Sequence, residues 1–147
     1  MVVFQKKRKT KNNKTIGTTE FRKIQEEKIL QKYSGFQMTM SSANQRLTGI
    51  KNRKRVGYGA SLMLPVLSYY LDNDLTCLDC IIDDDPKKTG QYYVNLPVRI
   101  THSGEFLSLK DSVCLLTSVA SRANVRPMLK KLFDLDVHDV IVPLSVV

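Results

Sequence analysis

The chain has 147 residues, which is enough for one domain of ordinary size, and 42% of them are hydrophobic, which is enough for a core. No run approaches the ~20 consecutive apolar residues that a transmembrane helix requires. The charged N-terminus is not followed by the apolar segment of a secretory signal, so we expect an intracellular, cytoplasmic protein.

The net charge of +9 is concentrated in the first third of the chain. Residues 1–55 hold 15 of the 23 Lys and Arg residues but only 3 of the 14 Asp and Glu residues, so the rest is mildly acidic. Residues 1–17 combine basic and polar side chains with almost nothing to bury, which predicts a disordered tail. Such a tail is a solvated extension, an electrostatic tether for RNA, DNA or anionic lipid, or a nuclear-localisation-like run.

Residues 18–54 predict a helical extension made of two helices. The first begins at Thr18 or Thr19, either of which can cap it, and Ser34 and Gly35 form its expected stop. The second helix covers SSANQRLTGIKN and leads through basic residues into the first strand. The apolar positions of the first helix form only a rough stripe, so its burial stays open.

Residues 55–147 predict a single α/β domain. The expected order is strand 55–60, helix 61–71, strands 75–83, 96–100 and 111–117, helix 122–135 and strand 139–147. The strands are near-continuous apolar runs, which is typical of strands covered on both faces. Short apolar strands alternating with helices predict a Rossmann-like, open and mostly parallel sheet flanked by helices.

The three cysteines, Cys77, Cys80 and Cys114, fit a reducing compartment because their number is odd. Cys77 and Cys80 form a CxxC, but a zinc site would need two further thiols or histidines nearby, and a thioredoxin-like pair would begin a helix. The pair lies instead in the apolar run LTCLDCIID. The sequence therefore predicts ordinary strand cysteines and no metal site.

Small or polar residues follow three of the expected strands, in the groups GYGAS at 57–61, DDD at 83–85 and TS at 117–118. Ligands of open α/β sheets bind outside the carboxyl ends of the strands, where the strand order reverses. We therefore expect these three groups to meet at one edge of the domain.

The glycine turn at 57–61 has two possible roles. Gly57 and Gly59 permit backbone angles that a side chain would block, and a helix beginning near Ser61 would offer N–H groups to a phosphate. Asp83 stands where an acidic residue commonly accepts a ribose hydroxyl. Because the turn lacks the third glycine of the dinucleotide fingerprint, close packing of strand and helix explains it equally well. The choice between an anion site and a packing device is open.

No catalytic constellation accompanies this turn. The sequence contains no P-loop, no complete GxGxxG, and no Ser/His/Asp or Cys/His pairing with local motif support. The three aspartates could hold Mg²⁺ or Ca²⁺, but Lys87 and Lys88 follow at once, so a solvated turn is the better interpretation. We expect no catalytic residue and no metal in this chain alone.

The segments KRVGYGAS and IIDDDPKKTGQYYVNLPVRI, followed by an apolar strand and a closing VIVPL, resemble the C-terminal domain of sugar C-methyltransferases over residues 42–147. These enzymes methylate a keto-sugar carried on a nucleoside diphosphate. The resemblance implies a Rossmann-like domain that helps form the nucleotide-sugar pocket. It also implies that this chain binds no cofactor, since S-adenosylmethionine would be bound by a separate domain or methyltransferase subunit.

The resemblance implies pocket contacts at the glycine turn and matches the second motif to Asp83, Asp84, Lys87 and Gly90. Together with the strand-end argument, the expected ligand-binding residues are Gly57, Tyr58, Gly59, Ala60, Ser61, Asp83, Asp84, Lys87, Thr117 and Ser118. The chain departs from the family pattern at Leu62 to Pro65, where small and polar residues are usual, and at Val94 and Asn95, where Pro-Gly is usual.

Two functions follow as expectations. The first is a nucleotide-sugar-binding module of a sugar C-methyltransferase system. The alternative is a non-enzymatic interaction module whose basic N-terminal arm contacts nucleic acid or an acidic partner.

Overall fold

The computed structural model describes residues 15–118 and 122–144, with side chains described for 20–118 and 125–144. The chain divides into two compact units, residues 1–34 and 35–147. Most of the predicted disordered tail, residues 1–14, lies outside the described residues. Residues 15–17 depart from that prediction because they belong to a helix. The second unit begins at Gly35, whereas the sequence placed the start of the α/β domain at residue 55.

A single helix, α1 (Thr15–Gly49), replaces the two helices expected before the first strand. The stop predicted at Ser34 and Gly35 is wrong, because one glycine costs a helix only about 1 kcal/mol relative to alanine. Packing further along the helix outweighs that cost. In the second unit Met40, Ala43 and Leu47 recur at helical spacing, are at most 5% exposed and join the core.

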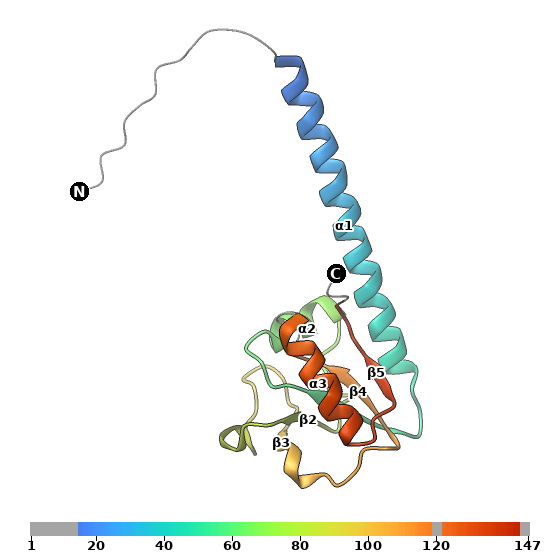
Figure 1. Ribbon diagram of the computed structural model, residues 1–147, viewed down its shortest axis with the longest axis vertical. Helices are drawn as coiled ribbons and strands as arrows, with labels where there is room; N and C mark the ends of the chain where they lie inside the picture. The colour runs from blue at the N-terminus through green and yellow to red at the C-terminus, as the bar shows by residue number, and fades with distance from the viewer. Residues whose placement is uncertain (1–14, 119–121, 145–147) are drawn as a thin grey trace, which may run out of the picture. The chain divides into compact units, whose positions relative to one another are not determined.

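The second unit contains a five-stranded parallel sheet in the order β3-β2-β1-β4-β5 (Figure 1). The first strand, β1, lies at the centre of the sheet. The next two strands, β2 and β3, extend the sheet on one side of β1, and β4 and β5 extend it on the other side. This order reverses between β1 and β4, as in doubly wound dinucleotide folds. The predicted open, Rossmann-like sheet and the order of its elements are confirmed: β1 (Lys54–Tyr58), α2 (Leu64–Leu71), β2 (Cys80–Asp83), β3 (Ile100–His102), β4 (Ser112–Leu116), α3 (Arg122–Asp134) and β5 (Asp139–Ile141).

The two faces of the sheet are covered by different helices. Along β4, Val113 and Leu115 join the core that includes α1 and α2, whereas Cys114 and Leu116 join the core that includes Leu132 of α3. All four are fully buried, which explains why the strand is an unbroken apolar run in the sequence.

Two predicted strands are shorter or shifted. β2 begins at Cys80, since residues 75–79 form turns, and β3 begins at Ile100, since residues 96–99 form a loop. Leu75, Leu96 and Val98 are nevertheless at most 4% exposed and belong to the core. Their apolar character reflects burial in loops, which a hydrophobic run cannot distinguish from a strand.

Charged side chains connect α1 and the residues after it to the sheet at the edge where β4 and β5 begin. Asp139 accepts hydrogen bonds from Arg46 at 3.0 Å and from Arg53 at 2.9 Å, and Arg53 also donates to the Ser112 carbonyl at 3.0 Å. No helix within 15–118 and 122–144 has the length and apolar character needed to cross a membrane.

Candidate functional site

The structure brings together the three groups of residues that follow β1, β2 and β4. The Gly59 N–H donates to the Ile82 carbonyl at 2.8 Å, and the Ala60 N–H donates to Asp83 Oδ2 at 2.7 Å. From the other side, Thr117 Oγ1 donates to the Gly59 carbonyl at 2.7 Å. The turn after β1 is therefore held between the ends of its two neighbouring strands.

The N–H groups of this turn are engaged within the protein. Besides the Gly59 and Ala60 donors, the Ser61 N–H points back to the Gly59 carbonyl at 3.1 Å. The predicted helix does not begin near Ser61, since α2 begins at Leu64, after Met63 and without a side-chain cap. The donors expected to face a phosphate thus have partners already, and one partner is the Asp83 carboxylate.

Packing accounts for both glycines of the turn. A Cβ atom at Gly59, where φ is +100°, would lie 2.4 Å from Ser118 Cβ and 2.9 Å from Met128 Cε. A Cβ atom at Gly57 would lie 3.1 Å from Thr117 Cγ2 and 3.2 Å from Ile81 Cγ1. Both positions are enclosed by neighbouring residues, so the geometry favours the packing device over the anion site at this turn.

Asp83 is 9% exposed and uses both carboxylate oxygens within the protein. Its Oδ1 accepts from the Asp85 N–H at 2.9 Å. Its Oδ2 accepts from the Ala60 N–H and from Lys88 Nζ, the latter at 3.1 Å. Three of the about four acceptor positions of this carboxylate are therefore taken by donors of the protein, which leaves little capacity for a ribose hydroxyl.

Asp84 faces other partners. It accepts hydrogen bonds from the Tyr58 hydroxyl at 3.0 Å, from Ser103 Oγ at 2.8 Å and from Lys131 Nζ. Burial raises the pKa of Tyr58 well above its usual value, and the hydrogen bond to Asp84 raises it further. Burial would also raise the pKa of Asp84, but the bonds from Lys131, Ser103 and Tyr58 outweigh it and lower that pKa.

Asp85 caps a short 3-10 helix, η1 (Pro86–Lys88), by accepting from the Lys87 N–H at 3.0 Å. The three adjacent aspartates therefore serve three separate purposes. Among the described residues, no group of three or more His, Cys, Asp or Glu side chains is placed to share a metal ion.

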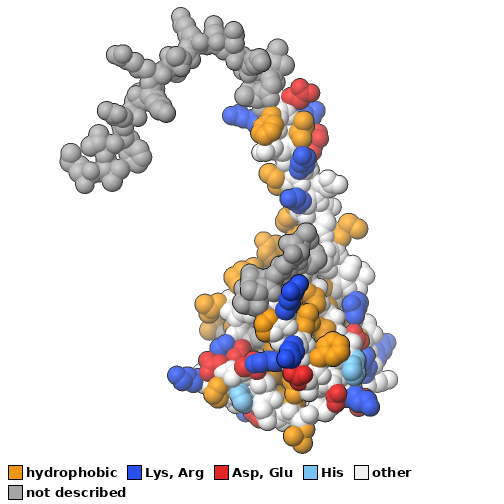
Figure 2. Space-filling view, in the orientation of Figure 1, with side chains coloured by type: hydrophobic (Ala, Val, Ile, Leu, Met, Phe, Trp, Pro, Cys, Tyr) orange, Lys and Arg blue, Asp and Glu red, His pale blue; other side chains and the backbone are white. Residues whose placement is uncertain are grey.

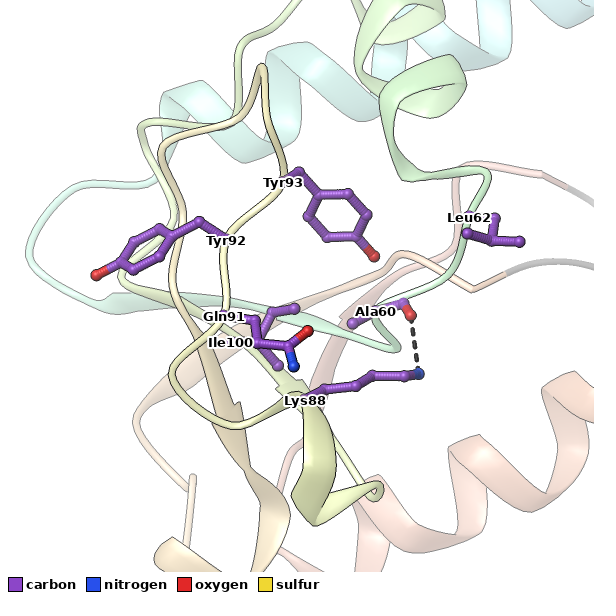
Figure 3. A pocket seen from close by; sticks show the side chains of 7 residues that line it. All are labelled: Ala60, Leu62, Lys88, Gln91, Tyr92, Tyr93 and Ile100. Carbon is purple, nitrogen blue, oxygen red and sulfur yellow. Dashed lines mark hydrogen bonds between the residues drawn. The ribbon is translucent and has the colours of Figure 1, made fainter.

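A pocket of about 250 Å³ opens beside the turn after β1, between that turn and the segment that follows η1. Figure 3 shows Lys88 and Tyr93 pointing toward Ala60 from opposite sides, whereas the ring of Tyr92 points away. Lys88 Nζ donates to the Ala60 carbonyl at 3.0 Å, and the Tyr93 hydroxyl donates to the Ser61 carbonyl at 2.8 Å. The residues that line the pocket are Ala60, Leu62, Lys88, Gln91, Tyr92, Tyr93 and Ile100.

Hydrogen bonds fix the loop that carries the two tyrosines. The Gly90 N–H donates to the Ile100 carbonyl at 2.8 Å, and the Ile100 N–H donates to the Gln91 carbonyl at 3.0 Å, which closes the base of the loop. Gly90 has a φ of +79° at this point. Val94 and Asn95 form the turn at the tip of the loop.

Only one sequence-predicted residue, Ala60, lines this pocket. Ser61 contributes to its surroundings through the carbonyl that binds Tyr93, whereas Gly57, Tyr58, Gly59 and Ser118 lie outside the lining, and Thr117 lines a different pocket. Lys87 is exposed and does not line the pocket either, and the lysine that does is its neighbour.

Sequence reasoning missed Lys88, Gln91, Tyr92 and Tyr93. One signal was available for the lysine. A residue three positions after the aspartate that caps a short helix turns back toward the helix start, which here brings Lys88 to Asp83. No comparable signal exists for the tyrosines, because the loop from 91 to 99 has no regular period.

Comparisons of the chain with models of protein families, with curated proteins and with solved structures return no match.

The distribution of charge on the surface bears on nucleic-acid binding. Figure 2 shows basic and acidic side chains interspersed over the visible face of the α/β unit, which is unlike the continuous basic stripe of a nucleic-acid-binding surface.

Proposed function

We propose that the chain binds the sugar-phosphate part of a nucleoside-diphosphate sugar in the pocket beside Lys88, as a module of a sugar C-methyltransferase system. In this proposal S-adenosylmethionine is bound by a separate domain or subunit. The observation that carries it is an ammonium group opposite the Tyr93 ring, in a pocket beside the turns that follow β1 and β2. Ligands of open α/β sheets bind at this edge.

Lys88 is the anion contact of the proposed site. An ammonium group has three N–H donors, and Lys88 uses two of them, on the Ala60 carbonyl and on Asp83 Oδ2. The third remains for a phosphate oxygen. The Lys88 side chain is 37% exposed, so a ligand reaches it without rearrangement of the sheet.

The tyrosines and apolar side chains suit the carbohydrate. Aromatic rings pack against the apolar faces of sugars and bases, and their hydroxyl groups bind polar edges. The Tyr93 ring faces the pocket, and Leu62, which also lines it, is 95% exposed and therefore available to a ligand. The volume of about 250 Å³ is below the roughly 300–1,000 Å³ of complete ligand sites, so this pocket holds part of the ligand.

Two adjacent lysines allow a matched test. We expect calorimetry with a panel of nucleoside-diphosphate sugars to detect binding to the wild-type chain and to Lys87→Met. Because Lys88 contacts the phosphate, Lys88→Met should weaken binding about tenfold or more, which corresponds to a charge-assisted hydrogen bond. Tyr93→Leu should also weaken it, because the Tyr93 ring faces the pocket, and this variant leaves the Asp83 partner in place.

The same binding measurements distinguish the proposed pocket from binding by the basic N-terminal arm and from binding of S-adenosylmethionine. Binding that survives in Lys88→Met but is lost on deleting residues 1–14 would support the basic arm as the binding element instead. S-adenosylmethionine should give no heat with this chain. If no nucleoside-diphosphate sugar binds to the folded wild type at saturating concentration, the proposal is refuted.

A further inference from the structure

Helix α2 is apolar on both of its faces. Leu64, Leu67 and Leu71 are at most 6% exposed and form part of the core. On the outward face, Tyr69 is 79% exposed, Tyr70 42% and Val66 41%, and Met63, which directly precedes the helix, is 58% exposed. We call these four residues the α2 outer face. A helix that is apolar all round is normally buried, so this face is suited to a partner.

A second pocket, of about 180 Å³, lies at the α2 outer face. It is formed by α1, α2 and the segments after β4 and β5, and Thr117 is the one polar residue among the residues that line it. Its walls include Met40, Leu67 and Leu144 together with Met63, Val66 and Tyr70 of the outer face. An apolar cavity of roughly 150 Å³ accommodates benzene, so this pocket has room for one aromatic ring.

We infer that the α2 outer face is a homodimer interface in which the Tyr69 ring of each copy enters the 180 Å³ pocket of the other. A two-fold dimer requires a self-complementary surface, which means that the protruding group and the recess must lie on the same patch. Tyr69 satisfies this condition, because its ring centroid is 5.3 Å from that of Tyr70, a wall of the pocket.

Charge does not oppose a second copy as the occupant. The unit that carries α2, residues 35–147, holds 13 Lys and Arg residues against 11 Asp and Glu residues, so its charges are nearly balanced. None of the four residues of the α2 outer face is charged, so two copies meet there without opposing like charges. Methionine and tyrosine are enriched at protein interfaces, and the outer face consists of Met63, Val66 and two tyrosines.

The test is sedimentation velocity on the full chain, from low micromolar to several hundred micromolar. We expect a reversible monomer–dimer equilibrium for the wild type. Tyr69→Ser should raise the dimer dissociation constant about tenfold or more, since an aromatic side chain at an interface centre often dominates binding. Tyr69→Phe should dimerise like the wild type, because the ring and not the hydroxyl fills the pocket. Val66→Arg should abolish the dimer by placing a like charge on each copy.

Phe133→Ser provides the matched control, because Phe133 is also aromatic, is 67% exposed and lies on α3, which covers the other face of the sheet. It should leave the equilibrium unchanged. Circular dichroism checks that each variant is folded. A wild type that is monomeric at every concentration would overturn the inference, as would equal weakening by Tyr69→Ser and Phe133→Ser. Because the assay contains no nucleotide sugar, its outcome is independent of the ligand proposal.

Discussion

Replacement of Gly59 by alanine measures how tightly the turn after β1 is closed. At φ +100° a Cβ atom adds backbone strain of about 1–2 kcal/mol, by analogy with the left-handed region. The new atom would also lie 2.4 Å from Ser118 Cβ and 2.9 Å from Met128 Cε, and such overpacking costs about 1–3 kcal/mol. We therefore expect Gly59→Ala to lower the free energy of unfolding by about 2–5 kcal/mol, a large share of the stability of a small domain.

Alanine substitutions at two other glycines separate the cost of backbone strain from the cost of crowding. Gly90 has a φ of +79°, but the nearest atom to its Cβ position is Arg99 Nη2 at 3.9 Å, so Gly90→Ala should show only the strain of about 1–2 kcal/mol. Gly57 has close neighbours at 3.1 and 3.2 Å without a positive φ, so Gly57→Ala should show crowding alone. Urea denaturation followed by circular dichroism gives all three values from the midpoints and slopes.

The free energies of unfolding of the three variants, compared with one another, test whether packing explains the glycine turn. If Gly59→Ala destabilises the chain no more than Gly90→Ala does, Ser118 and Met128 do not close the turn. The packing explanation for Gly59 would then be wrong.

Two further predictions concern titratable groups. Hydrogen bonds from Lys131, Ser103 and Tyr58 outweigh burial and lower the pKa of Asp84, so its contribution to stability is present above the ordinary pKa of aspartate and is lost as the pH falls through the lowered value. Urea midpoints measured against pH should fall less steeply in this acidic range for Asp84→Asn, and identical slopes would contradict the prediction. Burial raises the pKa of the Cys114 thiol to about 12, and Cys114 is fully buried, so a thiol reagent should label the half-buried Cys77 and Cys80 in the native state but Cys114 only upon unfolding. Equal labelling rates for the three cysteines would refute this prediction.

Much of the fold could be predicted because burial on both faces leaves a direct trace in the sequence. The residues of β4 are continuously apolar since alternate side chains face different helices, and α3 was expected close to its observed ends. The errors arose where burial occurs without regular structure. Leu75, Leu96 and Val98 are buried in turns and loops, and Gly35 lies inside a helix whose packing is decided by residues further along.

The site was predicted only in part, for a related reason. The meeting of Gly59, Asp83 and Thr117 follows from strand ends alone, because parallel strands bring their carboxyl ends to one edge. The pocket depends instead on which way side chains turn in an irregular segment. Whether Lys87 or Lys88 reaches the turn after β1 is decided by the path of η1, and the orientation of Tyr93 is decided by its bond to the Ser61 carbonyl. Neither side-chain direction can be predicted from a hydrophobic periodicity in the sequence.

The question raised by the incomplete glycine fingerprint has a physical answer in Asp83. In dinucleotide folds the turn after the first strand offers its N–H groups to a phosphate, but here the Asp83 carboxylate accepts from the Ala60 N–H. An anion of the protein therefore occupies the position of an anion of the ligand, and Lys88 neutralises it at 3.1 Å. A phosphate would gain little at the turn itself, because approach to Asp83 brings two negative charges together. In the proposed function the contact is instead the remaining N–H donor of Lys88, whose side chain is partly exposed on the side of the pocket.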